Sequence, residues 1–246
     1  MCTESTIVIR ARKALATGTD IDIHVPENIE STTFYFRNGR FANSFAEWWN
    51  LCKEFGIQDI KLSAPKKDVY HFPFGAAFEE NTIICFWNKR DVSQFRINHE
   101  CVDNKRKMTF YEERFDHDIT EVLNAYDNTE DYKHVLHDLS ALAEKIGYGH
   151  FSSMFDTAYE ILDEASTSNH DNAPYYLKDL PDRLKSIMLA RNYSYVFGGM
   201  GSWNDEPCGA ADEMGLGNEY NRLTDELILS MRRSLFYVTN TCWERA

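Results

Sequence analysis

The sequence predicts an α+β protein, with an antiparallel sheet and one packed helix in residues 1–116 and an antiparallel helical bundle in residues 117–246. Apolar residues recur at every second position before Asp116 and at every third or fourth position after it, which are the periods of strands and of helices. Charge divides at the same place. The formal net charge is −13, and residues 117–246, with 10 basic and 22 acidic side chains, account for −12 of it. We therefore expect two domains that meet near Asp116.

The first elements of the N-terminal part carry clear local signals. The stretch Thr32–Phe36 is β-branched and aromatic and therefore predicts a strand. An Asn-Gly pair at positions 38–39 then indicates a tight turn. Ser44 and Glu47 have the spacing of a capping box, which predicts a helix over Phe45–Phe55.

Four further strands are predicted after this helix, over Ile57–Leu62, Thr82–Trp87, Val92–Val102 and Lys107–Phe115. The connections among the last three are short and polar, so we expect an antiparallel meander. His99 lies on the apolar side of its strand, which favours an interior or interface histidine.

The C-terminal part has the apolar spacing of several helices. A short helix is expected over Asp118–Asn124, and a longer one begins at Asn128 or Thr129 and ends at Gly147. Two polar or glycine-bearing stretches, Ala165–Pro174 and Asn204–Asn218, are expected to be loops. The remaining predicted helices lie over Phe151–Leu162, from Pro181 onward, and over Tyr220–Cys242.

The string FGGMGSWND at Phe197–Asp205 is the most distinctive motif. Its glycines could present backbone N–H groups to an anion, but it has neither the Gly-Lys-Ser/Thr of a phosphate loop nor a preceding strand. We therefore favour a structural role. In that interpretation Gly198, Gly199 and Gly201 take positive φ angles, Trp203 fills the interior of the bundle, and Asn204 or Asp205 holds local backbone donors.

No other pattern indicates catalysis, a metal or a cofactor. His134 and His137 lie three residues apart, as metal ligands can, but they share the charged side of their helix and are expected on the surface. His117 lies between two aspartates in an expected acidic turn. A Cys–His nucleophile has no local signature here, and the G-x-S-x-G elbow is missing.

Composition also bears on compartment and partners. The six cysteines are widely spread without a C-x-x-C pair, which favours free thiols in a reducing cytoplasm. Neither a membrane span nor a secretion signal is expected. The acidity disfavours nucleic acid and favours a basic protein partner. Basic pairs and nearby aromatic residues are expected in solvated turns rather than in a single-strand binding site; they are Lys66, Lys67, Lys89, Arg90, Lys105–Lys107, Tyr70, Phe72 and Phe74.

The C-terminal part resembles an uncharacterised bacterial helical family that carries a G-G-M-G-S-aromatic-N-D signature after two or three amphipathic helices. The resemblance runs from about Val135 to Asn240 and includes the signature at Gly198–Asp205 and the acidic start of the last helix at Glu219–Leu223. The family's aliphatic stretch after the signature is replaced by Glu206–Gly209. Members of the family are similar to proteins encoded beside secreted bacterial toxins, so the resemblance implies toxin immunity.

The favoured function is therefore a cytoplasmic immunity protein that neutralises a basic toxin by occlusion, without chemistry of its own. Two alternatives stay open: an enzyme with a site between the two parts of the chain, and an adaptor or scaffold protein. The residues expected to bind the partner are Trp203, Asp205, Glu206, Asp212 and Glu213.

Overall fold

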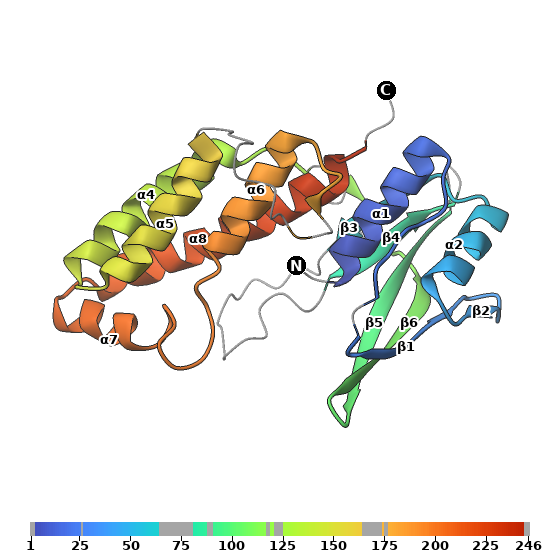
Figure 1. Ribbon diagram of the computed structural model, residues 1–246, viewed down its shortest axis with the longest axis horizontal. Helices are drawn as coiled ribbons and strands as arrows, with labels where there is room; N and C mark the ends of the chain where they lie inside the picture. The colour runs from blue at the N-terminus through green and yellow to red at the C-terminus, as the bar shows by residue number, and fades with distance from the viewer. Residues whose placement is uncertain are drawn as a thin grey trace. The chain divides into compact units, whose positions relative to one another are not determined.

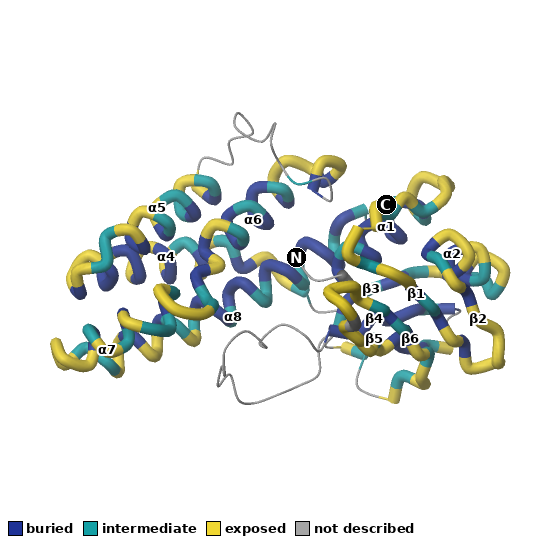
Figure 2. Tube along the Cα trace, turned by 60° about the horizontal axis from the view of Figure 1, so that its bottom comes forward, coloured by how far each residue is buried: buried dark blue, intermediate teal, exposed yellow. Residues whose placement is uncertain are grey.

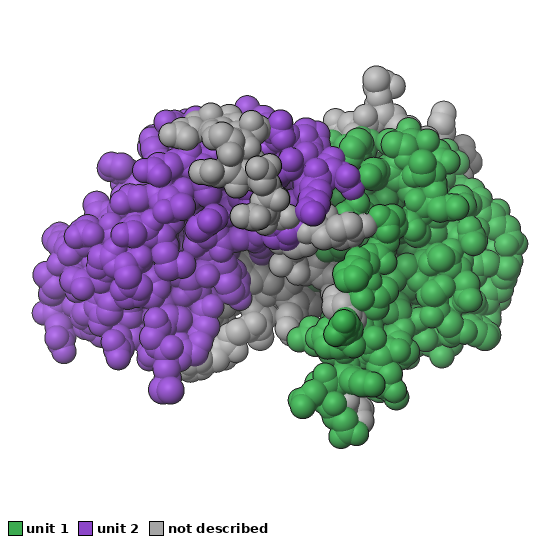
Figure 3. Space-filling view, viewed as in Figure 1, with its two compact units in different colours: residues 1–66, 78–125, 239–246 green, residues 67–77, 126–238 purple. Residues whose placement is uncertain are grey.

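The computed structural model describes residues 3–25, 27–63, 81–87, 91–116, 119–120, 125–163, 174 and 177–243. The chain folds into two compact units (Figure 3), of which unit 1 comprises residues 1–66, 78–125 and 239–246 and unit 2 comprises residues 67–77 and 126–238. The last residues of the chain thus belong to the same unit as the first. Several predictions concern residues that lie wholly or almost wholly outside the described ranges: the helix Asp118–Asn124, the loop Ala165–Pro174, His117, Lys66, Lys67, Lys89, Arg90, Tyr70, Phe72 and Phe74.

Unit 1 contains a six-stranded sheet in the order β2-β1-β6-β5-β4-β3. Its neighbouring strands are antiparallel except β1 and β6, which run parallel with Thr32 opposite Met108. The sheet is therefore mixed, and the prediction of an antiparallel sheet is wrong on this point. Periodicity identifies a strand but carries no information about which strand lies beside it. The strands are β1 Ile29–Tyr35, β2 Phe41–Ala42, β3 Asp59–Ser63, β4 Thr82–Phe86, β5 Val92–Val102 and β6 Lys105–Arg114.

Among the described residues, two helices and not one accompany the sheet (Figure 1). Helix α1, Thr3–Thr17, lies against β3 and β4, and α2, Phe45–Glu54, lies near β2. Helix α1 has no counterpart among the predicted elements, because most of its residues are buried (Figure 2) and it therefore lacks the apolar and polar faces that mark a surface helix.

The core of this unit is built around Phe34. Its ring stacks on Trp48 of α2 at 4.9 Å and on Phe110 of β6 at 4.4 Å, and Phe95 of β5 meets it edge-on. The capping box that starts α2 forms as predicted on one side, where Ser44 Oγ accepts from the Glu47 N–H at 3.1 Å. The Glu47 carboxylate, however, accepts from Asn43 rather than from Ser44.

The hairpin of β5 and β6 corrects the prediction for His99. This side chain is exposed rather than interior. In the described ranges β4 pairs with β5 only from Val92 to Phe95, so no described strand lies beside the outer part of β5 on that side. The alternation of apolar and polar residues along a strand therefore predicts burial only where other elements pack against that strand.

Unit 2 is helical in the part that the structure describes, and the long helices predicted in it are present. Its polar interior includes Asn128, whose Nδ2 donates to the Ser230 carbonyl at 3.0 Å and whose Oδ1 accepts from Ser234 at 3.1 Å. The prediction of an unbroken loop over Asn204–Asn218 is wrong, because α7 lies inside it. The helices are α4 Thr129–Lys145, α5 Gly149–Asp163, α6 Asp182–Tyr193, α7 Glu206–Glu213 and α8 Gly217–Thr241, the last of which ends in unit 1.

The short helix α7 depends on tertiary contact. Its two buried residues, Pro207 and Ala211, lie about one helical turn apart on the same side. The other residues of α7 are half-buried or exposed. Eight residues that include a proline and a glycine have too little helix propensity to form a helix alone. No helix of the described ranges combines the length and apolar content that a bilayer span needs.

Candidate functional site

The glycine loop, Phe197–Asp205, connects α6 to α7 and binds much of its own backbone. The Gly198 N–H donates to Asn204 Oδ1 at 3.2 Å, and the Gly201 N–H donates to Asp205 Oδ2 at 2.8 Å. The prediction that Asn204 and Asp205 hold local backbone donors is therefore confirmed. Because these two N–H groups are occupied inside the loop, they are not available to an anion.

Of the three glycines in this loop, only Gly201 has a positive φ angle that disfavours other residues. Gly201 has a φ of +78°, whereas Gly198 and Gly199 are not among the residues with positive φ, so the prediction for those two is wrong. The Ser202 N–H donates to the Gly199 carbonyl at 3.1 Å and closes a four-residue turn. A type II turn needs a positive φ only at its third residue, here Gly201. Met200, the second residue of this turn, is 99% exposed.

Trp203 anchors the loop in the interior. Its ring is fully buried, stacks on Tyr220 of α8 at 5.1 Å, and meets Phe155 of α5 edge-on at 5.3 Å. Its indole N–H donates to Thr224 Oγ1 at 2.9 Å. Two roles were expected for Trp203: filling the interior of unit 2 and binding a partner. The structure shows the first. The other role, contact with a partner, is excluded in this conformation because no face of the ring reaches the surface.

The other four residues expected to bind a partner lie on or beside α7 and form what we call the acidic cluster: Asp205, Glu206, Asp212 and Glu213. Glu206, Asp212 and Glu213 are exposed, and Asp205 is half-buried. Within the described residues, none of the four forms an ion pair with a basic side chain. Because Glu206, Asp212 and Glu213 are exposed, their charges can act on an approaching partner.

Tyr148, between α4 and α5, reports how closely these charges gather. Burial raises the pKa of its phenol, and the carboxylates of Glu206, Asp205 and Glu213 raise it further. On α7 itself, burial and the nearby Asp212 raise the pKa of the Cys208 thiol. Burial, the larger cause in both cases, and the neighbouring carboxylates act in the same direction, and both disfavour a phenolate or a thiolate at this surface.

Exposed methionines accompany the acidic cluster. Met200 lies at the tip of the glycine loop, and Met214, directly after α7, is 52% exposed. A flexible apolar side chain in water is typical of adaptable protein-binding surfaces. Neither methionine was among the residues expected to bind a partner, although their place in stretches expected at the surface was a usable signal.

The histidine and cysteine candidates stay apart from this surface. His134 and His137 are exposed on α4, as the charged side of that helix indicates. The described part of the chain contains no group of three or more His, Cys, Asp or Glu side chains arranged to hold a metal. Burial raises the pKa of Cys52 and Cys85 well above the ordinary value and that of Cys242 to about 12, so these thiols stay protonated at neutral pH.

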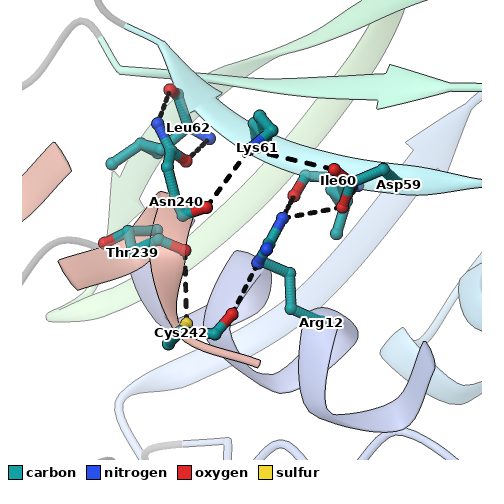
Figure 4. A network of polar contacts seen from close by, with 8 residues as sticks. All are labelled: Arg12, Asp59, Ile60, Lys61, Leu62, Thr239, Asn240 and Cys242. Atoms are coloured by element: carbon teal, nitrogen blue, oxygen red, sulfur yellow. Dashed lines mark hydrogen bonds and ion pairs between the residues drawn. The ribbon is translucent and has the colours of Figure 1, made fainter. Parts of the chain in front are cut away.

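A network of polar contacts in unit 1 joins α1, β3 and the last residues of α8 (Figure 4). Arg12 of α1 is buried; its Nε donates to the Cys242 carbonyl at 2.8 Å, and its Nη1 donates to Asp59 Oδ1 at 2.7 Å and to the Ile60 carbonyl at 3.2 Å. Asn240 binds the backbone of Leu62 in the same region. The guanidinium thus joins three segments of the unit, and we assign this network to the stability of the fold. No sequence pattern pointed to it, because Arg12 and Cys242 are 230 positions apart.

Comparisons of the chain with models of known protein families, with curated proteins and with solved structures give no match.

Proposed function

We propose that this protein binds a basic protein partner through the acidic cluster and that the complex blocks the partner's activity, as an immunity protein blocks a toxin. The observation that carries the proposal is the set of four carboxylates around α7 that have no ion-pair partner within the described residues. Charges of this kind raise the rate at which an oppositely charged protein associates and orient it on approach.

The methionines supply the apolar part of the proposed surface. Met200 is almost fully exposed and Met214 about half exposed, so both have apolar area to lose on binding. A core of apolar contacts within a charged rim is the usual arrangement of a protein interface. Trp203 supports this surface from inside, because it ties the glycine loop to α5 and α8.

The proposal extends to the arrangement of the helices in unit 2 and to the compartment of the protein. We infer that the long helices of unit 2 form an antiparallel bundle that carries the glycine loop and α7. A cytoplasmic location fits the buried, protonated thiols. The resemblance of Gly198–Asp205 to a family associated with toxin loci supports immunity over a general adaptor role, and the acidity disfavours nucleic acid as the partner.

The test is copurification of the full chain from its native host. The test variant replaces the acidic cluster by Asp205→Asn, Glu206→Gln, Asp212→Asn and Glu213→Gln. The matched control removes four exposed acids of α4 and α5 by Asp131→Asn, Asp138→Asn, Asp156→Asn and Glu160→Gln, so both variants change the net charge equally. We expect a basic protein to copurify with the unmodified chain and the control, and to be lost from the test variant.

Expression of the captured protein then separates immunity from an adaptor role. A partner that stops growth when expressed alone, and is harmless when coexpressed with this chain, supports immunity. A harmless partner supports an adaptor. An acidic partner, or one retained by the test variant, contradicts the proposed site.

A further inference from the structure

A row of aromatic side chains crosses the outer face of the sheet in unit 1. Phe34 and Phe110 point toward α2, because Phe34 stacks on both Trp48 and Phe110. Successive residues of a strand point to opposite faces, so Tyr35 and Tyr111 point away from that helix. The strand register places Phe41, Tyr35, Tyr111 and Arg96 side by side on β2, β1, β6 and β5. We call Phe41, Tyr35 and Tyr111 the aromatic row.

The aromatic row is open to solvent. Phe41 is 58% exposed, Tyr35 is 45% exposed and Tyr111 is 46% exposed. The rings of Tyr35 and Tyr111 stack on each other at 5.4 Å, so the row is a continuous apolar strip rather than three isolated side chains. Strips of exposed aromatic residues mark interaction surfaces, because large rings lose much apolar area at low entropic cost when they are covered.

The charges beside the row are balanced. Arg96 and Glu113 form an ion pair at 2.9 Å, and Lys107 and Glu30 form another at 3.7 Å, with all four side chains about half exposed. A nucleic acid would need an excess of positive charge here, and a strongly basic protein would need an excess of negative charge. Each of these four charges is already paired within one copy, so the face has no net charge to favour a strongly charged partner, and a second copy presents the same neutral aromatic face.

We propose that the aromatic row is the contact surface for a second copy of this chain, in a two-fold symmetric dimer whose sheets pack face to face. In such a dimer each copy offers the same patch, so every positive group of one patch can meet a negative group of the other. This surface belongs to unit 1 and does not include the acidic cluster, so the inference does not depend on the proposed function.

The size of the face determines the expected strength of the dimer. Four strands at a spacing of ~4.8 Å, with the seven residues of β1 at ~3.3 Å each, span at most roughly 19 by 23 Å, because β2 has only two residues. This is below the ~800 Å² per partner that is usual in stable complexes. The expected dimer is therefore weak and reversible, as complexes with small interfaces usually are.

Sedimentation of the full chain over the micromolar range tests the inference. We expect a concentration-dependent monomer–dimer equilibrium. The variant Tyr35→Ser with Tyr111→Ser should weaken dimerisation by at least about tenfold, because it removes the two stacked rings. The matched control is Tyr126→Ser with Tyr193→Ser, which removes two tyrosines of unit 2 that are equally exposed. This control should dimerise like the unmodified chain.

Charge variants provide a second, independent readout. Glu113→Arg leaves each patch with excess positive charge and should weaken the dimer, whereas Glu113→Arg combined with Arg96→Glu should restore it. Thermal unfolding verifies that each variant is folded. A chain that stays monomeric over the whole range, or a dimer that the tyrosine pair does not affect, would overturn the inference. Saturable binding of poly(U) by a monomeric chain, lost with the tyrosine pair, would also overturn it and assign the row to single-stranded nucleic acid.

Discussion

The side-chain amide of Asn240 pairs with both backbone groups of Leu62. Its Oδ1 accepts from the Leu62 N–H at 2.7 Å, and its Nδ2 donates to the Leu62 carbonyl at 2.9 Å (Figure 4). Leu62 belongs to β3, the last strand of the sheet, and an exposed edge strand offers unpaired backbone groups to other chains. Asn240 therefore occupies, at this position, the place that a further strand would take.

Asn240→Ala should lower the free energy of unfolding by about 2–4 kcal/mol, because two buried backbone groups of Leu62 lose their hydrogen-bond partner. The control is Asn221→Ala on the exposed side of the same helix, α8, which should change stability by less than about 0.5 kcal/mol. Urea denaturation of both variants measures the difference. Equal stability would mean that the Asn240 contacts contribute nothing.

Gly201→Ala should destabilise the fold by about 1–2 kcal/mol, because an alanine at a φ of +78° is strained. Gly199→Ala should have an effect of at most about 0.5 kcal/mol, since neither a positive φ nor a neighbouring atom within 4 Å opposes the added Cβ. Thermal unfolding of the two variants compares a strained and an unstrained position in one loop. A larger effect at Gly199 would contradict the turn described here.

The phenol of Tyr132 should make stability fall at high pH. Burial raises its pKa above the ordinary value of 10.0, and the hydrogen bond with Ser194 opposes that rise. Above pH ~10 the unfolded chain loses this proton while the folded chain keeps it, so the free energy of unfolding falls as pH rises. Below that pH the contribution is fully present.

Tyr132→Phe should reduce this alkaline loss of stability by up to about 1.4 kcal/mol per pH unit above pH ~10. Tyr193→Phe, at an exposed tyrosine, should leave it unchanged. Denaturation at a series of pH values from neutral to alkaline measures the slope for each protein. The buried thiols act in the same direction, but they are present in all three proteins and cancel in the comparison.

Thiol reactivity should separate exposed from buried cysteines. In a Cys2→Ser background, which removes a residue outside the described ranges, we expect the exposed Cys101 to react rapidly with a disulfide reagent and the half-buried Cys208 to react more slowly. Cys52, Cys85 and Cys242 should react only after unfolding. Rapid reaction of Cys242 in the native protein would show that the end of the chain is not held by Arg12 as described.

Signals that act over a few residues were enough to predict much of the molecule. The capping residue Ser44, the apolar stripes of α4, α5 and α8, and the binding of backbone donors by Asn204 and Asp205 all depend on neighbours within about one helical turn or one tight turn. For the candidate site, the acidic residues around α7 were predicted in the same way, because charged side chains in a polar stretch face water.

The features that could not be predicted involve residues far apart in the chain. The parallel pairing of β1 with β6, the burial of α1 and the formation of α7 each require a surface that another part of the chain supplies. Asn240 and Leu62 are 178 positions apart, and nothing in either local sequence marks them as a pair. Periodicity and capping depend only on neighbours along the chain, so they were enough to predict most elements and the sign of the charged surface. The partners of each strand, and which polar groups are buried together, followed from packing.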